Sequence, residues 1–302
     1  MRSALAAAFL LAALPLAAET PASSPSPAPE SSAAQTPDPA AAPTPDLSVP
    51  DLVVSAPPPG GVLPAIGNEA RRYGRDTIGL VTAPLSWNRQ DREKAAAFGV
   101  ILGGLFLADR SIDHQAAASR SPTTDSVSSA TMPFGAEGGF AVSAALVAAG
   151  LAFRDPATRD MGRDALEAAV LAGLLDNVVK RISGRERPVN SNGQTVFEPG
   201  SSNASFASGH TTVAFAVASV IAARSPGWIV PGLAYAAATL VGMDRINNRA
   251  HFASDVFAGA ILGTLTGRWL VHRHRAAEAN EDREATLELV PIARGLGAKI
   301  LF

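Results

Sequence analysis

Apolar residues along the chain gather in six stretches that are separated by charged residues or prolines. All six are rich in Ala, Leu, Val and Gly, and their lengths and composition favour helices over strands. They cover residues 91–109, 138–153, 162–181, 209–224, 228–243 and 252–273. The pattern therefore predicts an all-α protein, built as a bundle of about six helices.

The residues before the first predicted helix have a different composition. Residues 1–18 start with Arg2, continue with an apolar run and end in small residues, which is the pattern of a secretory signal peptide. Residues 19–62 hold twelve of the 23 prolines and too few apolar side chains to offset the entropy cost of ordering. We expect a signal peptide, or an uncleaved anchor, over 1–18 and a disordered Pro/Ala-rich tether over 19–62.

The helical domain is then expected over residues 65–275, followed by a C-terminal tail over 276–302. The tail ends in two β-like runs, LELV and KILF, with Gly295 and Gly297 between them. This pattern predicts a short hairpin, with a frayed tail as the alternative.

Membrane insertion stays open from the sequence. The predicted helices include charge-free runs at 225–243 and 138–153, of 19 and 16 residues, and a span needs about 20 mostly apolar residues. A cleaved signal would place residue 65 outside the membrane, whereas the arginines near Arg71 and Arg92 favour the cytoplasmic side. We expect an exported protein on the periplasmic side of the cell envelope, either peripheral to a membrane or embedded in it.

Composition removes several classes of function. The formal net charge is -2 and no basic stripe is present, which argues against nucleic acid as a partner. The absence of cysteine excludes a disulfide framework, a thiolate zinc site and a cysteine nucleophile. Any chemistry must therefore come from histidine, arginine, lysine, carboxylate or hydroxyl groups.

Polar residues suited to phosphate chemistry stand at the ends of four predicted helices. If consecutive helices alternate in direction, as short connections favour, these ends meet at one end of the bundle. The residues are Lys180 at the end of the third helix and Arg187 after it, Ser208, Gly209 and His210 at the start of the fourth, Arg245 after the fifth, and His251 and Asp255 at the start of the sixth.

The residue types in this set match the needs of an oxyanion ligand. Lys180, Arg187 and Arg245 are cations suited to a phosphate or a similar group. Ser208 can cap its helix and donate its hydroxyl, and Gly209 lets free backbone N–H groups approach the anion.

Two histidines complete the predicted site. His251 and Asp255 are four residues apart, so on a helix the carboxylate can reach the ring and select its tautomer. An oriented neutral imidazole can act as a nucleophile or a base. His210, on a different helix, is then available as the proton donor.

The spacing of these residues resembles the signature of the type 2 phosphatidic acid phosphatase / vanadium haloperoxidase superfamily. That signature reads K-x6-R-P, P-S-G-H and S-R-x5-H-x3-D, and the resemblance covers roughly residues 75–273. Ala207 replaces the proline of the second element and Asp244 replaces the serine of the third. The family is helical with its site at one end of the bundle, in line with the placement above.

The resemblance implies a role for each matched residue. His251 would attack phosphorus and become a phosphohistidine, with Asp255 orienting it. His210 would protonate the leaving oxygen and later activate water. The phosphoryl oxygens would be held by Lys180, Arg187, Arg245, Ser208 and the Gly209 N–H, so that neither a metal nor another cofactor is expected.

The implied activity is hydrolysis of a phosphomonoester or a pyrophosphate. The apolar helices around the site favour a lipid phosphate of the envelope over a small phosphoester. Three alternatives stay open: a soluble broad-specificity periplasmic acid phosphatase, a vanadate-dependent haloperoxidase, and a non-enzymatic tethered envelope protein.

The remaining polar residues receive structural interpretations. Asp244 is expected to form a salt bridge with Arg245 or Arg249. The others are interpreted as a helix–helix contact (Asp176 and Asn177), a charged helix end (Asp109, Arg110 and Asp113) and a solvated helix end (His272 and His274).

Overall fold

The computed structural model describes residues 62–131, 135–191, 193, 195–284, 287–292 and 295–300. The predicted signal peptide at 1–18 and nearly all of the predicted tether at 19–62 lie outside the described residues. Both stay predictions.

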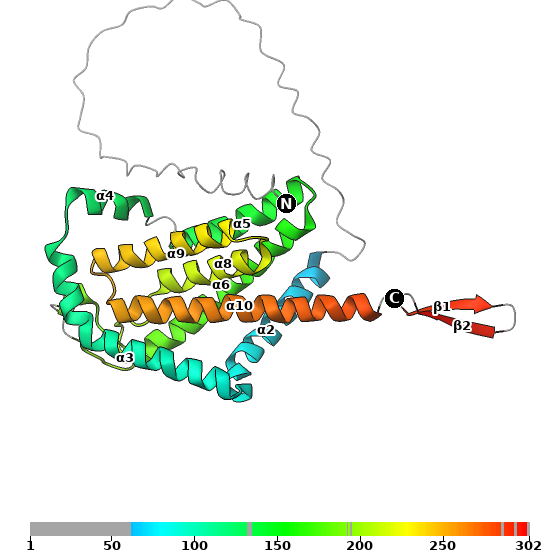
Figure 1. The fold of residues 1–302 in the computed structure, drawn as a ribbon, viewed down its shortest axis with the longest axis horizontal. Coiled ribbons are helices and arrows are strands. Elements are labelled where there is room, and N and C mark those ends of the chain that lie inside the picture. Colours follow the sequence, from blue (N-terminus) through cyan, green and yellow to red (C-terminus); the bar gives the residue numbers. More distant parts are fainter. Residues whose placement is uncertain are drawn as a thin grey trace, which may run out of the picture. The chain divides into compact units, whose positions relative to one another are not determined.

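The described part of the chain is helical apart from its C-terminal tail, which confirms the predicted all-α class. Each of the six predicted stretches coincides with part of one long helix, with at most one residue outside it (Figure 1). These six are α3 (Arg89–Ala118), α5 (Ala136–Ala152), α6 (Pro156–Ser183), α8 (Gly209–Arg224), α9 (Ile229–Asn247) and α10 (Ala253–Glu284).

Three further α-helices and one short 3-10 helix were not predicted. They are α2 (Val62–Thr82), η1 (Ala83–Ser86), α4 (Pro122–Thr131) and α7 (Pro188–Ser191). The α4 sequence PTTDSVSSAT is dominated by Ser and Thr, so it has no apolar stretch from which a helix could be predicted. Local side-chain to backbone hydrogen bonds and the contact of buried Ser128 with Asp244 of α9 hold this element in place.

Local signals in the sequence explain where the long helices begin and end. Asn88 caps α3 through a capping box, in which its side chain accepts from the Asp91 N–H and the Asp91 side chain accepts from the Asn88 N–H. Asp155 caps α6 ahead of Pro156, and Gly184 ends that helix in the left-handed region at φ 52°. A Cβ at Gly184 would fall 1.8 Å from the carbonyl oxygen of Glu198, so only glycine fits this turn.

The core is built around α8, which has buried residues at nearly every position from Thr211 to Ile221. Helices α5, α6, α9 and α10 pack on it, and Figure 1 shows α8, α9 and α10 lying roughly parallel. A helix that is apolar on all sides is expected at the centre of a bundle. Because α8 lies at the centre of the bundle, each of its two ends is next to the ends of neighbouring helices.

Close contact between α8 and α10 depends on small residues. Gly259, Gly263 and Gly267 follow one another at four-residue spacing on α10. A Cβ at Gly263 would lie 2.1 Å from the carbonyl oxygen of Thr212, and one at Gly267 would lie 2.5 Å from that of Ala216. The two backbones thus approach more closely than larger residues would allow.

The C-terminal tail forms the predicted hairpin. Strands β1 (Leu287–Ile292) and β2 (Gly295–Ile300) pair antiparallel, with Leu287 opposite Ile300 and Ile292 opposite Gly295.

Two of the described helices, α3 and α9, are long and apolar enough to cross a membrane. The pair α4 and α5, bent by 42° at a short break, would add a third span if it acted as one. Leu107 on α3 and Met243 on α9 are exposed at 90% and 60%, so these helices turn apolar side chains away from the core. An apolar surface of this kind fits contact with lipid.

Candidate active site

The predicted site residues come together because four helix ends meet. The N–H of Ser208, just before α8, donates to the carbonyl oxygen of Asp255 at the start of α10 over 3.0 Å. The carbonyl oxygen of Arg245, near the end of α9, accepts from the N–H of His251 at 3.2 Å. Gly209 lies against Lys180 of α6. These contacts place the ends of α6, α8, α9 and α10 around one site.

His251 is buried between α9 and α10, with 5% of its surface exposed. Its Nδ1 lies 2.7 Å from the carbonyl oxygen of Ser205. Because a carbonyl oxygen can only accept, Nδ1 must carry the proton and donate it. The other ring nitrogen, Nε2, is then unprotonated and keeps the lone pair that a nucleophile needs.

Asp255 supports this arrangement indirectly. Its carboxylate is 3.8 Å from Nδ1 of His251, which is longer than a hydrogen bond. The carboxylate instead accepts from the Ser205 hydroxyl at 2.6 Å and from the Phe252 N–H at 2.9 Å. The structure therefore differs from the direct contact that the spacing predicted: Asp255 holds Ser205, and Ser205 holds the ring.

Lys180 and Gly209 form the opposite wall of the site. Lys180 pairs with Asp176 one turn earlier on α6, so Asp176 contributes to the site rather than to a helix–helix contact alone. A Cβ at Gly209 would fall 2.8 Å from Oδ2 of Asp176 and 2.9 Å from Nζ of Lys180. Glycine is therefore required for the start of α8 to approach this ion pair.

Ser208 and His210 flank Gly209 with different exposures. Ser208 is fully buried, and its hydroxyl accepts from the Thr211 hydroxyl at 3.0 Å instead of capping α8 as expected. The side chain of His210 is 31% exposed, and its Nε2 lies 3.5 Å from a carboxylate oxygen of Glu137. A Cβ at Gly135 would fall 2.2 Å from the His210 ring, so this glycine makes room for it.

Arg245 is held by the residue that replaces the motif serine. Asp244 pairs with Arg245, and the Arg245 Nε–H donates to Oδ2 over 2.7 Å. Asp244 also accepts from Asn248 and from Ser128 on α4. Of the two partners expected for Asp244, the structure shows Arg245; Arg249 pairs instead with Asp113 at 2.7 Å.

The charges of the site act on both histidines. Burial lowers the pKa of His251 below its usual value, the charges of Lys180 and Arg187 lower it further, and Asp255 opposes them. Burial also lowers the pKa of His210, followed in size by the charge of Arg245. Arg187 is exposed, so its guanidinium lies at the edge of the site and acts on His251 through its charge.

A cavity of about 410 Å³ opens from this site between α5, α6 and α8. Its polar part is formed by Asp176, Lys180, Gly209 and His210. From there it follows α6 back to Ala169, a distance of about 16 Å at 1.5 Å per residue. This second part is mainly apolar and is lined by residues that include Phe140, Ala169, Val170, Leu174 and Val213.

Arg185 is the functional candidate that the sequence did not reveal. It is fully buried and donates to Asp255 at 2.5 Å and to Asp109 of α3 at 2.7 Å. Three aromatic rings surround its guanidinium, with the Phe252 centroid 4.0 Å and the Phe106 centroid 4.7 Å away. Arg185 thus fixes Asp255 from the side opposite Ser205.

The interpretation of Asp109 and Asp113 as a charged helix end is wrong. Helix α3 continues to Ala118, and both carboxylates are buried, with Asp109 bound to Arg185 and Asp113 to Arg249. The four-residue spacing, which puts both acids on one helix face, was the signal that could have shown this.

Comparison with known proteins agrees with these observations. Residues 162–278 match the sequence model of the PAP2 superfamily. This region contains every matched motif residue, from Lys180 to Asp255. A solved structure of a transmembrane PAP2 type phosphatidylglycerolphosphate phosphatase from Bacillus subtilis shares 22% identity, with a TM-score of 0.44, over 60% of this chain and 96% of that one.

Curated relatives include two bacterial proteins named lipid A 1-phosphatase. The one from Porphyromonas gingivalis is 34% identical over 151 residues, which is 46% of this chain and 31% of the relative. The one from Rhizobium etli is 39% identical over 99 residues, which is 31% of this chain and 42% of the relative. The chain thus spans less than half the length of these relatives. The matched signature and the arrangement of its residues together lead to one conclusion: residues 162–278 form a domain of the PAP2 superfamily.

Proposed function

We propose that this protein is a metal-independent phosphatase that hydrolyses a phosphorylated lipid of the cell envelope through a phosphohistidine intermediate. The observation that carries the proposal is the cavity beside Lys180 and His210. It joins a polar end suited to a phosphoryl group to an apolar end suited to an alkyl chain.

In the first step, Nε2 of His251 attacks phosphorus while the bond to the leaving oxygen breaks. His210 gives its proton to that oxygen, so the product leaves as an alcohol, or as a phosphate if the substrate is a pyrophosphate. Nδ1 keeps its proton and donates it in the hydrogen bond to the Ser205 carbonyl oxygen, which keeps the ring in the nucleophilic tautomer. Asp255 holds Ser205, and its negative charge stabilises the positive charge that develops on the ring.

In the second step, His210 takes a proton from water, and the water oxygen attacks the phosphohistidine. The P–N bond breaks and inorganic phosphate leaves with His251 restored. The phosphoryl oxygens are held by Lys180, Arg187 and Arg245, together with the Ser208 hydroxyl and the Gly209 N–H. In this assignment Asp244 keeps the Arg245 guanidinium in place, because it binds the same group.

The surroundings of the site favour a lipid over a small ester. Helices α3 and α9 are long and apolar enough to enter a membrane, and their apolar side chains face outward. The names of the two curated relatives place lipid A first among the substrates to test. We place the site on the periplasmic side, reached after export directed by residues 1–18.

Long-chain substrates should be strongly preferred over short-chain ones. Burying three or four methylene groups in the apolar part of the cavity contributes about 0.8 kcal/mol each, which corresponds to roughly a hundredfold gain in kcat/KM. Phosphate release from lipid A and from long-chain phosphatidate in detergent micelles should be compared with release from a water-soluble aryl phosphate. Equal kcat/KM for both kinds of substrate would contradict the lipid assignment and favour a broad-specificity phosphatase.

A pair of variants on α6 tests the cavity directly. Val170→Asn places an amide in the apolar part and should lower activity on the long-chain substrate alone. Val178→Asn, on the exposed face of the same helix, is the matched control. It should change neither the activity on the long-chain substrate nor the activity on the aryl phosphate.

The pH profile should report the two histidines. His251 must be neutral and His210 protonated for the first step, and the pKa of each is lowered by burial. We therefore expect kcat/KM to peak below pH 6.5 and to fall about tenfold per pH unit on the alkaline side, as His210 loses its proton. In His210→Asn this alkaline fall should disappear. A rate that keeps rising between pH 7 and 9 would rule out His210 as the acid.

A further inference from the structure

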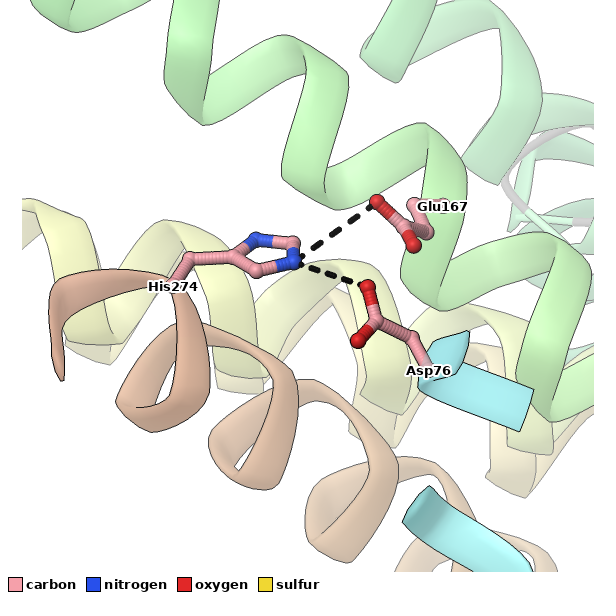
Figure 2. Close-up of side chains that lie close together, drawn as sticks. All are labelled: Asp76, Glu167 and His274. Atoms are coloured by element: carbon pink, nitrogen blue, oxygen red, sulfur yellow. Dashed lines mark hydrogen bonds and ion pairs between the residues drawn. The ribbon is translucent and has the colours of Figure 1, made fainter. Parts of the chain in front are cut away.

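A second group of ionisable side chains lies far from the active site. His274 of α10 faces Asp76 of α2 and Glu167 of α6, as Figure 2 shows. Its Nε2 is 3.1 Å from a carboxylate oxygen of Asp76 and 3.9 Å from one of Glu167. Glu167 lies thirteen residues before Lys180 on the same helix, which places this group about 20 Å from the phosphate site.

This group is buried, contrary to the prediction of a solvated helix end. Asp76 is 4% exposed, Glu167 is 1% exposed and the His274 side chain is 12% exposed. Helix α10 runs ten residues beyond His274, so the histidine lies within the helix and faces α2 and α6. His272, two residues earlier, is exposed as predicted.

The hydrogen bonding of His274 directs its second nitrogen at the two carboxylates. Nδ1 lies 2.8 Å from Oδ1 of Asp164, and Arg224 binds the other oxygen of that carboxylate at 2.6 Å. A carboxylate can only accept, so Nδ1 donates to Asp164, and Nε2 either donates a proton to Asp76 or shares a cation with Asp76 and Glu167. The geometry at Nε2 therefore suits a proton or a metal ion.

Three carboxylates face His274, namely Asp76, Asp164 and Glu167. Arg273 lies 2.5 Å from Asp76, and Arg224 binds both Asp164 and Glu278. A single proton on Nε2 can reach Asp76 but not Glu167 at 3.9 Å. An ion held about 2.0–2.2 Å from each ligand atom could bind all three.

We propose that Asp76, Glu167 and His274 bind a divalent transition-metal ion of the Zn²⁺ or Mn²⁺ type. One ligand atom from each residue lies within 4.8 Å of the others, which a small contraction would bring to coordination distance. One imidazole and two carboxylates suit such ions. Asp164 serves as the outer carboxylate that orients the histidine, as is usual for metal-bound imidazole. The ion joins α2, α6 and α10 and takes no part in phosphate chemistry.

The test uses the full chain without a polyhistidine tag, purified in detergent and stripped with a chelator. Zn²⁺ and Mn²⁺ are then added separately, with bound metal and the thermal midpoint measured at pH 7.5. We expect one equivalent of metal to bind and the midpoint to rise by about 5 °C or more at saturation. Phosphate release at 20 °C, well below the midpoint, should be equal in the stripped and loaded protein.

Matched variants identify the ligands. His274→Gln and Glu167→Gln should lose both the bound metal and the metal-induced rise of the thermal midpoint, whereas His272→Gln should keep both. If either of the first two fails to fold, Asp76→Asn supplies the same comparison. Retention of one equivalent by folded His274→Gln and Glu167→Gln would overturn the proposal.

A proton in place of the metal would also overturn it. In that case the stripped protein would bind no metal at millimolar concentration, and its midpoint would rise on acidification alone. Because the phosphate site is assayed separately, loss of phosphatase activity in every preparation would count against the proposed function and not against the metal site.

Discussion

Replacing His251 by alanine is expected to abolish phosphate release, with kcat falling by at least about 10⁴-fold. The reason is geometric. The Ser205 carbonyl fixes the proton on Nδ1, so Nε2 is the nitrogen available to attack phosphorus. Alanine supplies no nucleophile, and water in its place would lack both the orientation and the covalent intermediate. The measurement is phosphate release from a long-chain lipid phosphate under single-turnover conditions.

Two comparisons separate chemistry from folding in this experiment. His114→Ala removes an exposed histidine of α3 and should leave the rate unchanged. His210→Asn should slow the second step, so that phosphate stays on the protein after a single turnover, and no such labelled protein should form in His251→Ala. Full activity of a folded His251→Ala variant would remove His251 as the nucleophile.

The sequence predicted best those features that depend on neighbours along the chain. The apolar run of α8 ends at Arg224 and starts at Gly209, and the helix has the same bounds as predicted. The meeting of the ends of α8, α9 and α10 was also predictable, since the short connections between these helices make neighbours antiparallel. Both results follow from local patterns and from the direction of the chain.

Features that depend on distant partners were missed. The link from Arg185 to Asp109 spans 76 residues, and nothing in the local sequence SGRER distinguishes a buried arginine from a solvated one. The contact between Ser205 and His251 involves a backbone carbonyl, which carries no sequence signal at all. His274 was misjudged because the apolar stretch ends at residue 273, although the helix does not.

Arg185→Met is expected to destabilise the protein more than any other single change at the site. The guanidinium is fully buried between Asp109 and Asp255, so methionine would leave two buried carboxylates without their cation. Breaking a buried ion pair in this way costs about 3–5 kcal/mol of unfolding free energy. The thermal midpoint measured in detergent should fall accordingly, while Arg181→Met, at an exposed position near the end of α6, should leave it unchanged.

Arg185→Lys then separates positioning from stability. Lysine keeps the charge but has one ammonium group in place of the two-armed guanidinium, so it cannot hold Asp109 and Asp255 together. If Arg185 positions Asp255, and through it Ser205 and His251, the folded lysine variant should lose kcat by roughly tenfold or more with KM nearly unchanged. A purely structural role predicts a lower midpoint with normal kcat. The two outcomes differ because the chain of contacts from Arg185 ends on the nucleophile and not on the groups that hold the substrate.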